Sequence, residues 1–243
     1  MCELHDHPQP GRTRLILPMP LGQTHDAMLN GEKHVLDSLA PDTVMMMGDN
    51  PALPKVPEKP TLLDFFRTRI NGITRRHLLT SAHRAMEQGM DEKVVLAILL
   101  HDIAVACLIR ADHGYWGAQM IAPYVDEEVA FAVQYHQCLR YYADEANGYP
   151  YPESYNRFFG PDYAPPDYIR ADAEHARNHR FYLSARQVTV FDSYFFDDTP
   201  APDSEIFADI IGRHFRQPSQ GLGFDNSPVA HMWRTVIWPH NAL

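Results

Sequence analysis

One histidine and one aspartate stand next to each other in an otherwise apolar stretch of the chain. The stretch Val94–Ile109 reads VVLAILLHDIAVACLI, and 14 of its 16 residues are apolar or small, the exceptions being His101 and Asp102. A helix of this composition must be buried nearly all round. An unpaired ionised carboxylate would be costly there, whereas a divalent cation held by imidazole and carboxylate together would neutralise it. The pair predicts a metal site; a neutral buried histidine beside a hydrogen-bonded aspartate is the alternative.

Three further histidines and a second aspartate extend this pattern. His77 lies 24 residues before His101, His113 lies 12 residues after it, and His136 follows a further 23 residues on. Asp192 lies among apolar and aromatic residues in RQVTVFDSYFFDD. One histidine on an apolar helix face is more often a core residue than a ligand. Four of them in this order, with two aspartates, favour a metal centre.

The order His … His-Asp … Asp resembles the pattern of the HD-domain superfamily, and the two additional histidines resemble its dinuclear branch. The stretches RRHLLTSAHRAMEQGMDEKVVLAILLHDI and DHGYWGAQMIAPYVDEEVAFAVQYHQCLRYY look most like the mixed-valent diiron oxygenases. These include enzymes that cleave organophosphonates oxidatively and, more distantly, myo-inositol oxygenase. The likeness is local, covering about a quarter to a third of the chain.

The resemblance implies an all-α fold, an HD-domain helical bundle, with two metal ions. The first ion would be held by His77, His101, Asp102 and Asp192, and the second by His113 and His136, with Asp102 bridging the pair. Asp197 and Asp198 compete with Asp192 for the last carboxylate position. The implied metals are two iron ions (Fe2+/Fe3+), with Mn, Zn or Mg as alternatives.

Arg140 lies four residues after His136 and therefore projects from the same helical face. In the phosphonate-cleaving enzymes a lysine at the equivalent place contacts the anionic substrate, so the resemblance implies that Arg140 binds substrate. The alternative is a surface arginine near a helix end. The chain also departs from those enzymes: Arg67 and Ile70 replace a tyrosine and an acid, and Val105 replaces a histidine. The resemblance therefore predicts the metal ligands more strongly than it predicts the substrate.

The expected function is a non-haem diiron oxygenase that oxidises a small polar, anionic, organophosphonate-like substrate with dioxygen. The alternative is a metal-dependent phosphohydrolase or hydratase acting on a nucleotide, a phosphoester or another small molecule, in which the metals acidify a bound water. A third reading is a non-catalytic ligand-binding module. The complete set of six ligands argues against that reading.

Helices must position these residues. Periodicity predicts helices over 62–70, 74–88, 91–109, 112–121, 126–145, 171–196 and 204–215, the third, fourth and fifth capped by Asp91, Asp112 and Asp126. The proline- and tyrosine-rich composition of residues 147–167 predicts a long loop. Its aromatic residues form either a lid or a packed surface, and they are Tyr149, Tyr151, Tyr155, Phe158, Phe159 and Tyr163. His175 and His179 are four apart, but their charged neighbours favour a solvated face over a metal clip.

Two segments are expected. Residues 1–60 carry nine prolines and predict an extended N-terminal arm. Residues 61–243 form the HD domain, whose C-terminal tail, with Trp233 and Trp238, packs on the core. The dipeptides His5-Asp6 and His25-Asp26 repeat the His-Asp pair in a proline-rich segment, and we interpret both as chance matches.

Charge and composition limit the partners. Lys and Arg sum to 21 against 31 Asp and Glu, a net charge of −10, which disfavours binding to nucleic acid or anionic membranes. Three cysteines are too few for a disulfide framework, and the longest apolar stretch is too short to span a bilayer. No secretory signal is visible, so a cytoplasmic protein is expected. The expected partners are a small-molecule substrate and dioxygen, and the expected state is a monomer or small homo-oligomer.

Overall fold

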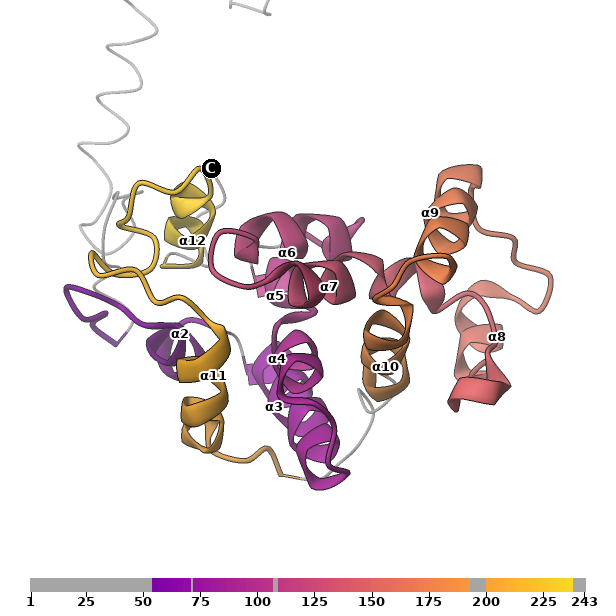
Figure 1. Cartoon of the computed structure of the whole chain (residues 1–243), viewed down its shortest axis with the longest axis horizontal. Helices are drawn as coiled ribbons and strands as arrows, with labels where there is room; N and C mark the ends of the chain where they lie inside the picture. Colours follow the sequence, from indigo (N-terminus) through magenta and orange to yellow (C-terminus); the bar gives the residue numbers. More distant parts are fainter. Residues whose placement is uncertain (1–53, 71, 107–108, 193–199, 238–243) are drawn as a thin grey trace, which may run out of the picture. The chain divides into compact units, whose positions relative to one another are not determined.

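The computed structural model describes residues 54–70, 72–106, 109–192 and 200–237. Most of the expected N-terminal arm lies outside this range, together with both chance dipeptides, Asp197, Asp198 and Trp238. The described residues form helices, with no strand beyond a single bridge between Asp144 and Tyr149 (Figure 1). The all-α expectation is therefore confirmed for this part of the chain.

The helices that precede residue 140 carry five of the six expected ligands or end next to them. They are α2 (Leu62–Thr68), α3 (Gly72–Glu87), α4 (Glu92–Leu100), α5 (Ile103–Ala106), α6 (His113–Ile121) and α7 (Glu127–Leu139). The later elements are η1 (Glu145–Asn147), α8 (Glu153–Phe159), α9 (Asp167–Arg177), α10 (Tyr182–Asp192), η3 (Ser204–Phe207), α11 (Ala208–His214) and α12 (Ala230–Ile237).

Side-chain caps start several of these helices where the sequence predicts. The Asp91 carboxylate accepts from the backbone N–H of Lys93, and Asp126 accepts from that of Val129. Both caps satisfy N–H groups that have no partner within the helix. Asp112 precedes α6 as expected, but its side chain does not cap the helix; it accepts from the Tyr168 hydroxyl, and its backbone is left-handed (φ 50°).

The prediction of a single helix over 91–109 is wrong. α4 ends at Leu100 and α5 begins at Ile103, with a turn at His101 and Asp102 between them. His101 keeps helical backbone angles (φ −58°, ψ −37°), so the interruption is short.

The helix expected over 126–145 ends earlier, at Leu139, where side chains from later elements take its last carbonyl groups. Arg186 donates to the carbonyl of Leu139 (3.1 Å), and the Tyr149 hydroxyl donates to the carbonyl of Arg140 (2.8 Å). The chain then reverses through Gly148, whose φ of 79° suits glycine. These contacts hold the C-terminal end of α7 against α10.

The later half also differs from expectation. The loop expected over 147–167 contains α8, and the helix expected over 171–196 is divided into α9 and α10. Asn178 ends α9, because its side-chain amide donates back to the Glu174 carbonyl (2.9 Å) and competes with helix continuation. His175 is exposed as predicted, whereas His179 stacks on Phe131 with ring centroids 4.0 Å apart.

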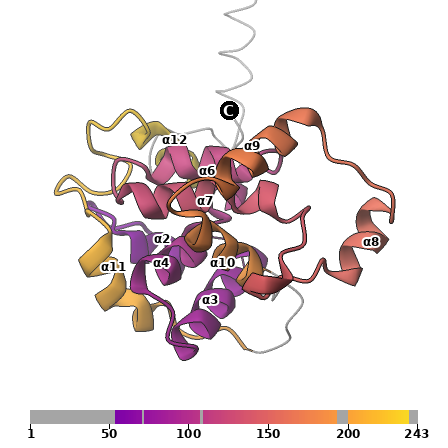
Figure 2. The same cartoon turned by 45° about the vertical axis from the view of Figure 1, so that its right-hand side comes forward.

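α7 forms the centre of the core, packing against α4, α6 and α10. Figures 1 and 2 show these helices gathered with α3, whereas α8 lies at the edge of the described residues in both views. The described part of the C-terminal tail packs on the core. Trp233 of α12 is fully buried, donates its indole N–H to the Met120 carbonyl (2.9 Å) and packs edge-on against Phe65.

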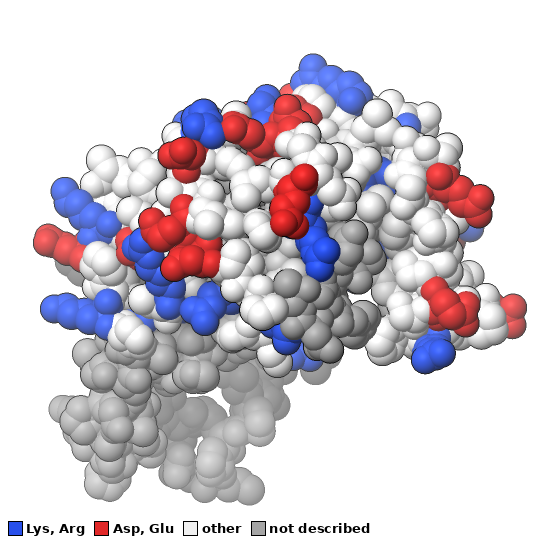
Figure 3. Space-filling view, turned by 90° about the horizontal axis from the view of Figure 1, so that it is seen from below, with Lys and Arg blue, Asp and Glu red and all other residues white. Residues whose placement is uncertain are grey.

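Charges of both signs alternate on the face shown in Figure 3. Among the ion pairs, Arg213 binds Glu92 (2.7 Å) and Lys93 binds Asp126 (2.7 Å). None of the helices that the structure describes combines the length and the apolar character needed to cross a membrane.

Candidate metal centre

The structure brings all six predicted ligands together from five segments that are distant in sequence. His77 lies on α3, and the turn after α4 supplies His101 and Asp102. His113 is the first residue of α6, His136 lies on α7, and Asp192 is the last described residue of α10. They form two groups that could each hold a metal ion, His77, His101, Asp102 and Asp192 in one and Asp102, His113 and His136 in the other.

The ligand atoms of the first group lie within 4.8 Å of one another. His77 Nε2 is 3.0 Å from His101 Nε2 and 3.2 Å from Asp192 Oδ1. Asp102 Oδ2 is 3.7 Å from His77 Nε2, and Asp102 Oδ1 is 3.7 Å from His101 Nε2. Two nitrogens at about 2.1 Å from one ion and about 90–100° apart are about 3.0–3.2 Å from each other, so the spacing fits ligands of a single ion.

The second group shares Asp102 with the first. His113 Nε2 and His136 Nε2 are 3.2 Å apart, and Asp102 Oδ1 lies 3.1 Å from the former and 3.8 Å from the latter. Asp102 therefore turns Oδ2 toward His77 and Oδ1 toward His113. This is the orientation that a carboxylate bridging two metal ions requires.

Backbone carbonyls fix which nitrogen of three imidazoles faces the centre. Nδ1 of each ring bonds to the carbonyl three residues earlier: His101 to Ile98 (2.7 Å), His113 to Arg110 (3.0 Å) and His136 to Val133 (2.6 Å). A carbonyl can only accept, so Nδ1 carries the proton and Nε2 of the neutral ring presents its lone pair to the centre. Such an outer hydrogen bond is typical of metal-binding histidines.

The spacing and protonation of the His113 and His136 rings indicate whether a metal ion fits between them. With both Nδ1 atoms protonated, two bare Nε2 atoms face each other at 3.2 Å and repel unless a cation lies between them. Burial and the positive charge of the neighbouring imidazoles hold the pKa of His136 well below its usual value, so a proton is a poor occupant at this ring. A metal ion resolves the conflict, and these residues fit one.

The two carboxylates stay ionised although they are largely buried. Burial opposes ionisation of Asp192, but the Arg140 guanidinium, 2.8 Å from Oδ2, and hydrogen bonds from His101 and His77 hold its pKa well below the usual range. Burial likewise opposes ionisation of Asp102, and the His101 and His113 imidazoles lower its pKa. The centre thus presents two negative charges to a cation.

Close packing of α6 on α7 sets the distance between the second group's histidines. A Cβ atom added to Gly114 would lie 2.7 Å from the Gln134 carbonyl oxygen and 3.0 Å from that of Val133. Thr189 of α10 donates to the His136 carbonyl (3.0 Å), tying the ligand's backbone to the helix that carries Asp192. Sequence reasoning missed both contacts, because glycine and threonine in a helix carry no ligand signal of their own.

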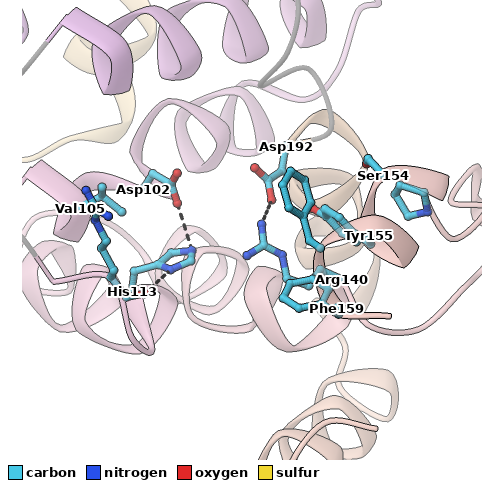
Figure 4. Close-up of a pocket in the computed structure, with 11 residues that line it drawn as sticks. Asp102, Val105, His113, Arg140, Ser154, Tyr155, Phe159 and Asp192 are labelled. Carbon is cyan, nitrogen blue, oxygen red and sulfur yellow. Dashed lines mark hydrogen bonds and ion pairs between the residues drawn. The ribbon is translucent and has the colours of Figure 1, made fainter. Parts of the chain in front are cut away.

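A cavity of about 420 Å³ opens beside the centre. Its wall includes Asp102, His113, Arg140 and Asp192, so Arg140 lies at the site as the sequence predicts, and one of its Nη atoms is committed to Asp192. In Figure 4, Asp102 and His113 lie on one side, Tyr155 and Phe159 on the other, and Arg140 with Asp192 between them.

Four further wall residues were not predicted as site residues: Val105, Arg110, Pro152 and Ser154. Val105 contributes an apolar patch, and the exposed Arg110 contributes a second cation. Arg110 lies three residues before His113, and that spacing from a predicted ligand is the one sequence signal that could have indicated it. Among the aromatic residues of the expected loop, Tyr155, Phe158 and Phe159 line the cavity.

Metal binding to the first group is expected to release about one proton per chain near pH 7.5. Burial disfavours the His101 imidazolium, but the Asp102 and Asp192 carboxylates outweigh it and raise the pKa of His101 to about 9 in the metal-free protein. Below that pH the proton competes with the metal. The apparent affinity for Zn2+ should therefore rise about tenfold per pH unit toward pH 9 and level off above it.

Calorimetric titration in buffers of different ionisation enthalpy counts the protons. His83→Ala, on the same helix as His77 but not among the ligands, serves as the control and should release the same number. A Zn2+ affinity that does not change between pH 7 and 9 would contradict the assignment.

No protein-family model matches the chain, and no curated protein sequence is significantly similar to it.

Proposed function

We propose that this protein is a dinuclear non-haem iron oxygenase that oxidises a small anionic molecule with dioxygen. The observation that carries the proposal is the composition of the second group, two histidines and one carboxylate: His113, His136 and Asp102. A site with these three ligands and open positions is typical of non-haem iron oxygenases. When bound, a reduced iron pair would supply the electrons for dioxygen activation.

The two groups differ in the number of ligands that the protein supplies. The first has four ligands from the protein, whereas the second has three, and Asp102 is shared. Both border the cavity, the first through Asp102 and Asp192 and the second through Asp102 and His113. With one protein ligand fewer, the second group leaves more positions open for substrate and dioxygen. The local resemblance to HD-domain diiron oxygenases supports the same division.

Arginine side chains at the cavity favour an anionic substrate. Arg140 lines the wall beside Asp192, and Arg110 adds a second guanidinium. Guanidinium groups bind carboxylates and phosphates through paired N–H donors. We assign Arg140 to substrate binding through the N–H groups that Asp192 does not use.

The decisive test is iron-dependent oxygen consumption. Protein loaded anaerobically with Fe2+ should bind about two ions per chain and consume dioxygen when a panel of small organophosphonates is added. His113→Ala should keep the first ion and lower oxygen consumption at least about 100-fold, since the second group loses a ligand. After limited exposure to dioxygen, which would remove one electron from the Fe2+ pair, paramagnetic resonance should detect a mixed-valent Fe2+/Fe3+ pair in the unaltered protein, and His83→Ala should behave like it.

A metal-dependent hydrolase is the second candidate, because a shared carboxylate between two metal groups also suits water activation. Protein that retains stoichiometric zinc, consumes no dioxygen with iron and hydrolyses phosphoesters would replace the first proposal with this one.

A further inference from the structure

We infer that the substrate joins an anionic, metal-chelating head to an apolar, aromatic tail, and that the tail lies against Phe158 and Phe159 of α8. This inference rests on the proposed metal centre and narrows the substrate class beyond a small polar anion. The observation behind it is the uneven distribution of side chains around the cavity.

The polar groups gather where the cavity meets the metal centre. Asp102 and His113 border it there, and Arg140 donates to Asp192 on the same side. A chelating anion placed at this end would meet ligand-bearing groups and a guanidinium together. Nothing further along the α8 wall offers a comparable concentration of charge, because Ser154 is the one hydrophilic non-aromatic residue that α8 contributes.

The opposite wall is aromatic and faces open space. Phe158 remains 63% exposed and Phe159 36% exposed, and α8 contains no buried residue. Large exposed aromatic side chains next to a cavity are costly to leave in water, and burial against an apolar ligand group recovers that cost. Val105 of α5 lies on the other side of the cavity, with Asp102 and His113 (Figure 4).

Neighbouring rings hold Phe159 in place before any ligand arrives. Its ring stacks on Tyr163 (centroids 5.1 Å apart) and makes edge contacts with Tyr155 (5.7 Å) and Tyr141 (5.5 Å). Edge-to-face contacts of this kind fix ring orientation. A flat aromatic tail would extend this set of rings.

Tyr155 contacts residues at both the metal end and the aromatic end of the cavity. The Arg140 guanidinium carbon lies 5.4 Å from the centre of the Tyr155 ring, which is the geometry of a cation–π contact. The cavity volume of about 420 Å³ is within the range of roughly 300–1,000 Å³ typical of small-molecule sites. A two- or three-carbon anion would leave the aromatic half hydrated, whereas a molecule with a tail would fill it.

Two hydroxamates test the metal end and the aromatic end of the cavity separately. Acetohydroxamate and benzohydroxamate share a chelating head and differ in the tail. We expect the metal-loaded protein to bind benzohydroxamate at least about tenfold more tightly in calorimetric titration. Phe159→Ala should reduce that ratio to about threefold or less while leaving the acetohydroxamate affinity unchanged. Phe158→Ala should act in the same direction, and its exposed side chain contributes little to folding.

Phe224→Ala is the matched control, since Phe224 is a similarly exposed aromatic residue (43%) that does not line the cavity. Equal affinities for the two hydroxamates, binding of neither, or an unchanged ratio in both phenylalanine variants would overturn the inference. In that last case α8 would present its aromatic face to something other than substrate. Hydroxamate binding needs metal but no oxygen chemistry, so discrimination without oxygen consumption would reject the oxygenase alone.

Discussion

Asp102→Asn is expected to empty both metal groups at once, lowering metal content from about two ions per chain to below about 0.2. The reason is that Asp102 faces His77 with one oxygen and His113 with the other. An amide keeps the shape but removes the charge, and only one of its two polar atoms can coordinate a metal. At a free metal concentration of about 100 times Kd, each lost ion removes about 3 kcal/mol of stabilisation.

Elemental analysis and thermal unfolding with and without a chelator measure this effect. His113→Ala should lose only the second ion, so the two variants distinguish a shared ligand from a local one. Asp209→Asn, an exposed aspartate of α11, is the control and should retain both ions. If Asp102→Asn still held one ion per chain, Asp102 would not be the bridge.

Gly114→Ala is expected to remove the second ion although it changes no ligand. The added methyl group would lie 2.7 Å from a carbonyl oxygen of α7, and backbone cannot rearrange as a flexible side chain does. α6 must therefore move away from α7, which separates His113 from His136. We expect a stability loss of about 1–3 kcal/mol and about one ion per chain instead of two.

Gly212→Ala provides a control for the effect of alanine in a helix. It lies in α11 with no atom within 4 Å of the added Cβ, so alanine should be neutral or stabilise by up to about 1 kcal/mol. Chemical denaturation and metal analysis of both variants check the prediction. A Gly114→Ala protein with two ions and unchanged stability would show that the packing of α6 on α7 does not set the site.

The sequence predicted six residues that the structure places together, and the clearest signal was His101 with Asp102, because an uncompensated polar pair is conspicuous in an apolar stretch. It also located the helix starts at Asp91 and Asp126, since side-chain caps are local interactions. It could not predict the break at His101 and Asp102. The apolar sequence continues across that turn, so no local signal marks it.

The end of α7 and the formation of α8 were missed for a related reason. Arg186 and Tyr149 take the last carbonyl groups of α7 from positions distant in sequence, and no local signal announces them. The proline and tyrosine content of residues 147–167 indicated a loop, yet α8 forms between its prolines. Whether Arg140 binds substrate stays a prediction, because the structure adds a partner, Asp192, that the sequence did not reveal.

His101 directly follows the end of α4. The carbonyl end of α4 therefore lies next to a metal ligand, and it carries roughly half a negative charge from its aligned peptide dipoles. This backbone field adds to the two carboxylates and attracts cations before any ligand atom makes a bond. We therefore expect the metal-loaded chain to resist unfolding better than the metal-free chain, so that metal supply would influence how much protein persists.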